Sequence, residues 1–236
     1  MKFPSTFKTL RFGTSGIPPE VKDQGYFAGV KFLKERDLSA MEMEFVQHVH
    51  MDEETALALG ALARELGIAL SAHAPYYVNL ASLEKEKIYA SINRLIKASV
   101  ITASAQGHSV VFHAGYYQGR KKEEVFGMIA QGIEKIEAEL ERKGVSIWLR
   151  PELTGKSTQF GSLDELIRLT NLFEYVLPCI DFSHLHARTC GKFNTRDEWV
   201  EVLERLKSGT PKEKNILKRM HIHISGIEYG TKGERR

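Results

Sequence analysis

The sequence of 236 residues has few cysteines and no long apolar run. Cys179 and Cys190 are its only cysteines, which argues against a disulfide scaffold and indicates a reducing compartment. No stretch of about 18 apolar residues occurs, which excludes a membrane-spanning helix. Residues 1–13 lack the apolar segment of a signal peptide, so we expect a cytoplasmic protein. The net charge of +3 permits a polyanionic partner without requiring one.

Glycine-rich phosphate-binding motifs are also missing. The nearest stretch, Gly13-Thr-Ser-Gly16, is too short for a dinucleotide fingerprint or a P-loop. There are seven prolines but no proline-rich linker, and neither an internal repeat nor a low-complexity segment occurs. Hydrophobic residues make up 42% of the chain, which is enough for a sizeable core. We therefore expect one domain over residues 1–236.

Short apolar runs alternate with amphipathic stretches along the whole chain. This alternation predicts an α/β fold with a parallel sheet, and the strand count favours a TIM (β/α)8 barrel over a doubly wound open sheet. Seven β/α units are visible and the eighth is missing, so we expect a barrel that is truncated at its C-terminal end. Strands are expected at 10–17, 40–46, 68–74, 108–114, 145–152, 175–182 and 219–225, and helices at 23–37, 52–66, 82–105, 121–143, 162–172 and 195–208.

Several of the expected strands end in a residue type that binds metals. In a TIM barrel the C-terminal ends of the strands meet at one rim, where ligands bind. One such residue alone is more often structural, but five strands that end this way favour a metal site, because buried charges need partners. Imidazoles combined with carboxylates favour Zn²⁺, with Mn²⁺ or Fe²⁺ as alternatives. The candidate ligands are His73, His113, Glu152, Asp181, His184 and His223.

The last expected strand offers two histidines on one face, His221 and His223. Side chains two residues apart on a strand point to the same side, so both qualify by direction. His223 lies nearer the C-terminal rim, and we therefore prefer it as the ligand.

Two tyrosine pairs, Tyr76–Tyr77 and Tyr116–Tyr117, follow the third and fourth expected strands. Exposed aromatic rings beside a metal site suit stacking on bases or insertion into a minor groove. We expect one tyrosine of each pair to pack beneath its loop. Basic residues that also follow strand ends, Arg120 and Arg188 among them, would favour a phosphate-containing substrate.

Four motifs together resemble the endonuclease IV family, the zinc-dependent abasic-site endonucleases of base excision repair, which have a xylose-isomerase-like TIM barrel. They are HAPYYVNL at 73–80, VVFHAGYYQG at 110–119, PELTGKSTQFGSLDEL at 151–166 and CIDFSH at 179–184. In addition, FGTSGIP at 12–18 and HIHISGIEYG at 221–230 look like the first and seventh strands of that family. The resemblance covers nearly the whole chain.

The resemblance implies an enzyme that hydrolyses the phosphodiester 5′ to an abasic site in double-stranded DNA, with up to three zinc ions. It implies that Glu152 and Asp181 are the catalytic carboxylates, because they hold the metals and the water. It also implies a monomer without membrane association. The ligands it implies are His73 and His113 for the first zinc, Glu152 as a bridge, Asp181 and His223 for the second, and His184 for the third. The implied DNA-binding residues are Tyr76, Tyr77 and Asn79.

The sequence departs from this family at its C-terminal end. The family has a further glutamate ligand on strand eight and an Asp-Arg-His pattern after strand seven, whereas this sequence ends Gly233-Glu-Arg-Arg236. Glu234 can replace the aspartate, but no histidine follows it. Two alternatives therefore stay open. One is a xylose-isomerase-like sugar isomerase or epimerase with one or two divalent metals, and the other is a zinc-containing DNA-binding barrel that does not cleave.

Overall fold

The computed structural model describes residues 7–235, and its internal contacts divide the chain into two compact units. Unit 1 comprises Met1–Val78, Tyr89–Phe112 and Lys135–Leu149, and unit 2 comprises Asn79–Ile88, His113–Glu134 and Arg150–Arg236. The expectations that concern residues 1–6 and Arg236 lie outside the described residues. The expectation of a single domain stays a prediction.

Unit 1 is built on a parallel sheet whose strand order follows the chain, β1-β2-β3-β4-β5. The register places Ala40 beside both Gly13 and Ala69. A glycine is required at position 13, because a Cβ there would lie 1.8 Å from the Ala40 carbonyl oxygen. The strands are β1 (Gly13–Ser15), β2 (Ala40–Glu44), β3 (Ala69–His73), β4 (Ser109–Phe112) and β5 (Trp148–Pro151), the last of which continues into unit 2 at Arg150.

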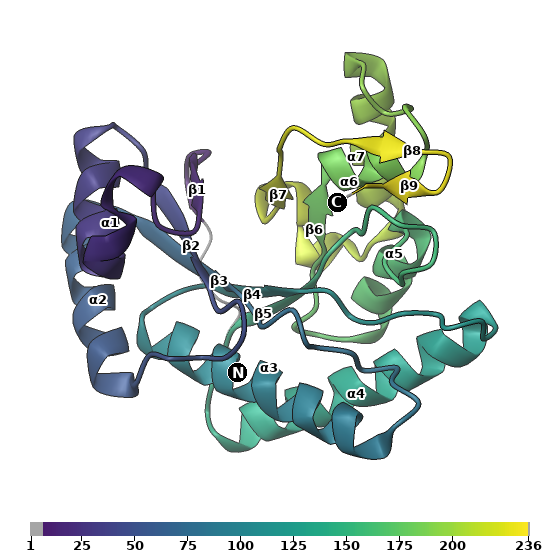
Figure 1. The fold of residues 1–236 in the computed structure, drawn as a ribbon, viewed down its shortest axis with the longest axis horizontal. Coiled ribbons are helices and arrows are strands. Elements are labelled where there is room, and N and C mark those ends of the chain that lie inside the picture. The colour runs from purple at the N-terminus through teal and green to yellow at the C-terminus, as the bar shows by residue number, and fades with distance from the viewer. Residues whose placement is uncertain (1–6, 236) are drawn as a thin grey trace. The chain divides into compact units, whose positions relative to one another are not determined.

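The first two α-helices, α1 (Gly25–Glu35) and α2 (Glu53–Leu66), follow the 3-10 helix η1 (Pro19–Gln24) and pack beside β2 and β3 (Figure 1). The start of α2 is fixed by Asp52, whose carboxylate accepts a hydrogen bond of 2.8 Å from the Thr55 N–H. Its end is fixed by Gly67, which has the left-handed φ of 74°. The longer helices are α3 (Lys85–Ser104) and α4 (Lys122–Arg142).

Unit 2 holds a second parallel strand pair, β6 (Cys179–Asp181) and β7 (His221–His223), in which Asp181 is the register partner of His223. A parallel bridge between Glu152 and Cys179 connects the end of β5 to β6. The parallel neighbours therefore continue in chain order from β5 to β7. Because parallel strands end at the same edge, the residues at the ends of β5, β6 and β7 come together.

Unit 2 also contains a short helix and a hairpin that the sequence pattern did not predict. A short helix, α6 (Phe182–Arg188), follows β6 directly, and a hairpin of β8 (Tyr229–Gly230) and β9 (Gly233–Glu234) lies against it at the yellow end of the chain (Figure 1). The remaining elements are α5 (Leu163–Leu172), α7 (Arg196–Gly209) and the 3-10 helices η2 (Lys212–Lys214) and η3 (Ile216–Lys218). Across residues 7–235, no helix is both long enough and apolar enough to span a bilayer.

Candidate metal centre

A buried carboxylate, Glu152, lies at the centre of the candidate site in unit 2. Its side chain is 3% exposed and follows the last residue of β5. One oxygen, Oε2, lies 2.7 Å from His113 Nε2, and the other, Oε1, lies 2.9 Å from His223 Nδ1. His184 Nδ1 lies 3.6 Å from Oε1. Three imidazoles from three different segments therefore surround one carboxylate.

A second carboxylate, Asp181, stands beside this group at the end of β6. Its Oδ1 accepts the His184 N–H at 2.7 Å, which caps α6, and its Oδ2 lies 3.3 Å from His184 Nδ1. Burial raises the pKa of Asp181, and the charge of Glu152 raises it further, against the opposing effects of His184 and His223. Two ionised carboxylates in this buried position repel each other, and a bound cation would remove that penalty.

We call these five residues the Glu152 cluster: His113, Glu152, Asp181, His184 and His223. Single ligand atoms of Glu152, Asp181 and His184 lie within 4.8 Å of one another, which is close enough for one metal ion to bind all three. Nitrogen and oxygen donors of this kind are the set that zinc uses in catalytic sites, and manganese or iron accept the same set. The residues present therefore fit a divalent metal.

His73, the remaining predicted ligand, is the last residue of β3 in unit 1 and is buried. Its Nδ1 lies 2.8 Å from the Ala74 carbonyl oxygen. When Nδ1–H donates to that oxygen, the lone pair is on Nε2, as is usual for histidines that bind metals. Membership of His73 in a metal site stays a prediction.

Both rings of the tyrosine pair after β3 are exposed, whereas only one of them was expected to be. Tyr76 is 49% and Tyr77 63% exposed, so the prediction that one of them packs beneath the loop is wrong. The Tyr76 hydroxyl donates to Glu44 Oε2 at 3.1 Å, and its ring lies 5.1 Å from the ring of His73. Both rings are available for stacking on an unpaired base or for insertion between bases.

For the second pair the prediction is confirmed, because Tyr117 is buried while Tyr116 is 37% exposed. The Tyr117 hydroxyl donates to the Glu165 carboxylate at 2.8 Å. Burial and the hydrogen bond to Glu165 raise the pKa of Tyr117 above its usual value. This tyrosine therefore has a structural role, connecting the loop after β4 to the start of α5.

Asn79 belongs to unit 2 and shapes its own loop. Its Oδ1 accepts the Ala81 N–H at 3.1 Å, and the neighbouring Leu80 N–H donates to the Ala114 carbonyl at 2.9 Å. A Cβ on Gly115 would lie 2.7 Å from Asn79 Oδ1, so glycine is needed beside this side chain. A contact between Asn79 and DNA stays a prediction.

Two of the basic residues expected to serve a phosphate instead bind the backbone. The Arg188 guanidinium donates to the carbonyl oxygens of Lys156 and Gln159, at 2.6 and 3.1 Å. Arg120 donates to the Ala81 and Tyr117 carbonyls. These contacts hold the loops after β4 and β5 and so give Arg120 and Arg188 a structural role. A contact between either of them and a phosphate stays a prediction.

The unpredicted hairpin brings one more carboxylate near the Glu152 cluster. The Glu234 N–H donates to the Gly155 carbonyl at 3.0 Å, and Glu234 Oε2 lies 3.9 Å from His184 Nε2. The turn residues between the paired Gly230 and Gly233 are Thr231 and Lys232. Neither is a typical residue of a two-residue hairpin turn, so the sequence carried no clear signal for this hairpin.

The fold and the site define a family. Residues 30–236 match the family described as "Xylose isomerase-like TIM barrel", and the chain belongs to that family. The prediction of a TIM-barrel α/β fold is therefore confirmed.

Individual proteins similar to this chain include both endonucleases and epimerases. An uncharacterized protein of Methanocaldococcus jannaschii is 44% identical over 96% of this chain and 80% of its own length. A probable endonuclease 4 of Sulfurihydrogenibium is 29% identical over 70% of this chain and 64% of its own length, less than two thirds of that protein. The second match supports the resemblance to endonuclease IV.

Two solved structures share the fold. The crystal structure of endonuclease IV from Thermus thermophilus is 22% identical, covers 85% of this chain and 71% of its own, and has a TM-score of 0.65. The crystal structure of 3-keto-D-glucoside 4-epimerase from E. coli is 15% identical in sequence and has the same TM-score of 0.65. The match covers 92% of this chain and 80% of the epimerase chain. At these identities the likeness concerns the fold, so the reaction must be argued from the site.

Proposed function

We propose that this protein is a zinc-dependent phosphodiester hydrolase that cuts double-stranded DNA on the 5′ side of abasic sites. The observation that carries the proposal is the position of Glu152, buried and shared among His113, His184 and His223. The similarity to probable endonuclease 4 proteins supports the choice of reaction.

In this proposal the residues of the Glu152 cluster hold the metals and keep them in place. When bound, zinc would lower the pKa of water and neutralise negative charge on a phosphate group. Glu152 presents one oxygen to His113 and the other to His223, and so suits a carboxylate that bridges two positions. Asp181 is fixed by the start of α6, which limits its movement during the reaction. His73 is proposed as a further ligand.

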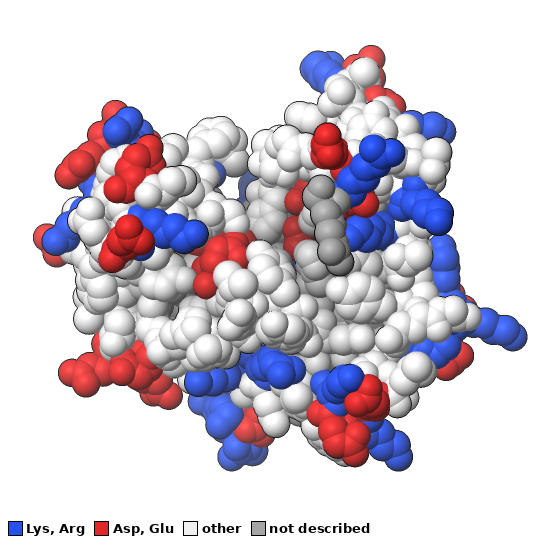
Figure 2. All heavy atoms as spheres, viewed as in Figure 1, with Lys and Arg blue, Asp and Glu red and all other residues white. Residues whose placement is uncertain are grey.

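The two exposed tyrosines, Tyr76 and Tyr77, are proposed to contact the DNA beside the lesion. Aromatic rings that insert at a base step stabilise an unstacked nucleotide, and a sugar without a base is the least costly nucleotide to extrude. The net charge is only +3, and Figure 2 shows acidic and basic side chains intermixed on the viewed face. Specific contacts to the lesion, more than a general positive field, should therefore determine where the protein binds.

The alternative is a sugar epimerase or isomerase that uses a divalent metal. It is favoured by the similarity in fold to 3-keto-D-glucoside 4-epimerase, whose TM-score equals that of the endonuclease. Such an enzyme moves a proton on the carbon next to the carbonyl group of a small sugar, and it does not need two exposed aromatic rings that insert between bases. The exposure of Tyr76 and Tyr77 therefore favours the nuclease.

A nicking assay tests the proposal. A duplex with one tetrahydrofuran abasic analogue should be cut 5′ to the analogue, whereas the undamaged duplex should stay intact. The Glu152→Gln variant should lose about 100-fold or more of the rate, because the bridging charge is removed. Glu123→Gln, at a carboxylate with 74% exposure outside the cluster, is the matched control and should cut normally.

The same preparation distinguishes the alternatives. Epimerisation of a ketose without any nicking would overturn the nuclease proposal and favour the sugar enzyme. Tight binding to the abasic duplex without cleavage, in protein shown to contain metal, would favour a non-cleaving DNA-binding barrel.

A further inference from the structure

A second group of metal-binding side chains lies one strand step below the rim on β6 and β7. Cys179 precedes Asp181 by two residues and His221 precedes His223 by two, and the register pairs Cys179 with His221. Side chains two residues apart on a strand share a face and lie about 6.6 Å apart along it. The two strands therefore carry an oxygen–nitrogen pair at the rim and a sulfur–nitrogen pair below it.

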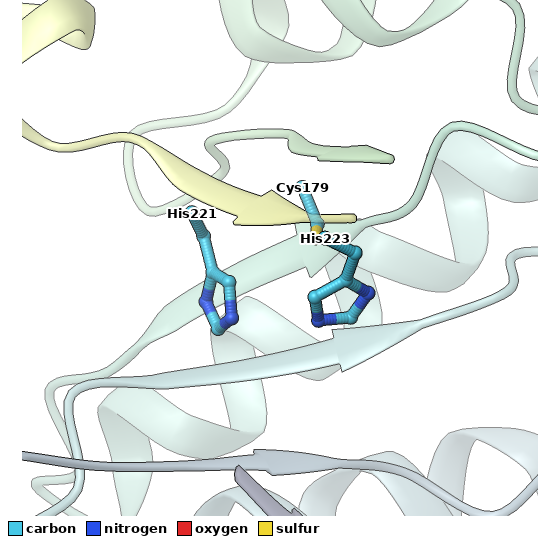
Figure 3. Close-up of side chains that lie close together, drawn as sticks. All are labelled: Cys179, His221 and His223. Carbon is cyan, nitrogen blue, oxygen red and sulfur yellow. The ribbon is translucent and has the colours of Figure 1, made fainter. Parts of the chain in front are cut away.

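The three side chains Cys179, His221 and His223 converge, and we call them the Cys179 group. One ligand atom from each lies within 4.8 Å of the others. Both imidazoles extend to the same side of β7, with Cys179 behind them on β6 (Figure 3). Their ring centroids are 5.2 Å apart and the rings are nearly perpendicular, at 85°. Cys179 is fully buried, whereas both histidines are partly exposed and accessible to an ion.

Arg150 fixes the two strands at this level. Arg150 is 2% exposed, and its guanidinium donates to the Pro178 carbonyl at 3.0 Å and to the Arg219 carbonyl at 2.6 Å. Pro178 directly precedes Cys179, and Arg219 lies two residues before His221. One buried side chain therefore joins the beginnings of β6 and β7, and this preorganises the donors that follow.

We propose that the Cys179 group binds a thiophilic divalent cation, Zn²⁺, at a position beside the Glu152 cluster, with which it shares His223. A thiolate and two imidazoles are typical zinc ligands, and three protein ligands leave a fourth position for water or a small anion. On binding, the Cys179 thiol releases its proton to solvent and the thiolate coordinates the ion. His223 contacts Glu152 through Nδ1, so it connects this position to the Glu152 cluster.

Cobalt substitution tests this proposal, because Co²⁺ bound by a thiolate shows an intense near-ultraviolet charge-transfer band that nitrogen and oxygen ligands do not give. The full chain is stripped of metal, titrated with Co²⁺, and then competed with Zn²⁺. The wild type should show the band, and Zn²⁺ should abolish it. Cys179→Ser should lose the band, and His221→Asn should weaken Co²⁺ binding about 10-fold or more.

Cys190→Ser is the matched control, since Cys190 is the exposed second cysteine and lies outside the group. It should keep the full band. No band in fully loaded wild type, or an undiminished band in folded Cys179→Ser, would overturn the proposal. If Cys179→Ser fails to fold by circular dichroism, the partly exposed His221→Asn decides, and unchanged Co²⁺ affinity there overturns the proposal.

The outcome is independent of the proposed nuclease activity. Nicking without the band would refute the Cys179 site alone, and the band without nicking would refute the nuclease alone.

Discussion

At the residue scale, the position of a side chain on its strand was easier to predict than its partners. The strand-end pattern selected Glu152, Asp181 and His223, and the structure brings these three together in unit 2. Which imidazole meets which oxygen of Glu152 depends on side-chain rotamers and on strand pairing, which a sequence pattern does not contain. For the same reason, the backbone contacts of Arg188 were not predictable from its position after a strand.

We predict that His113→Ala removes cleavage while the protein stays folded. His113 contacts Glu152 at 2.7 Å, and its side chain is 24% exposed, so the substitution leaves no sealed cavity. The nicking rate at the abasic analogue should fall about 100-fold or more, and bound zinc should decrease. The rate is measured by gel and the metal by mass spectrometry, with circular dichroism as the control for folding. Wild-type nicking by this variant would show that the metal assignment is wrong.

Arg150→Met should destabilise the fold by about 3 kcal/mol, since the buried Pro178 carbonyl and the partly buried Arg219 carbonyl would lose a charged donor. Urea unfolding followed by circular dichroism measures this, with metal absent so that binding does not contribute. The matched control is Arg196→Met, at a guanidinium that is 88% exposed, and its free energy of unfolding should change by no more than about 0.5 kcal/mol. Equal stability of the two variants would contradict the role assigned to Arg150.

At the element scale, the alternation of strands and helices was predictable because each element carries its own period and its own end signals. Strands β1 to β7 all lie within the seven expected ranges, and Ser162 and Glu165 form a capping box at the start of α5. The short helix α6 was not predicted, because Asp181 serves as the last residue of β6 and as the N-cap of α6 at once. No loop residues separate the two elements, so the strand pattern extends into the helix.

A carboxylate at the start of α7, Glu198, should make the free energy of unfolding depend on pH in the acidic range. Glu198 accepts hydrogen bonds from the Phe193 N–H, which contributes most, then from the Thr195 hydroxyl and from the N–H groups of Asn194 and Thr195. Together these bonds lower the pKa of Glu198 from 4.5 to about 2. The folded state therefore favours the ionised carboxylate. This contribution to stability is present above pH 4.5 and is lost as the pH falls towards about 2.

Glu198→Gln should accordingly be less stable than the wild type at pH 7, and the difference should shrink between pH 4.5 and about 2. Urea midpoints across this range measure the effect. Glu201→Gln, at an exposed position on the same helix, is the matched control and should follow the wild type at every pH. A difference for Glu198→Gln that stays constant with pH would contradict the assigned cause.

At the scale of the whole molecule, the order of the strands fits the TIM-barrel family to which the chain belongs, whereas the reaction depends on a few side chains. Neighbouring strands from β1 to β5 and from β6 to β7 are parallel and follow the chain, which is the arrangement that the sequence spacing predicted. Epimerases and endonucleases share this framework. The distinction between them therefore depends on the Glu152 cluster and on the exposed tyrosines, because fold alone does not determine function.

Metal removal should lower the thermal stability of the whole protein. Glu152 and Asp181 are buried carboxylates that repel each other without a cation, so metal binding favours the folded state. At a metal concentration about 1,000 times the Kd, the stabilisation is about 4 kcal/mol, or roughly 10 °C in Tm for a chain of this size. Differential scanning calorimetry with and without EDTA, followed by zinc addition, measures the shift. The Cys179→Ser variant should keep most of the increase in Tm on zinc binding, whereas the Glu152→Gln variant should lose most of it. The reason is that the larger desolvation penalty lies in the pair of carboxylates, Glu152 and Asp181. An equal loss in both variants would show that the metals bind as one unit through His223.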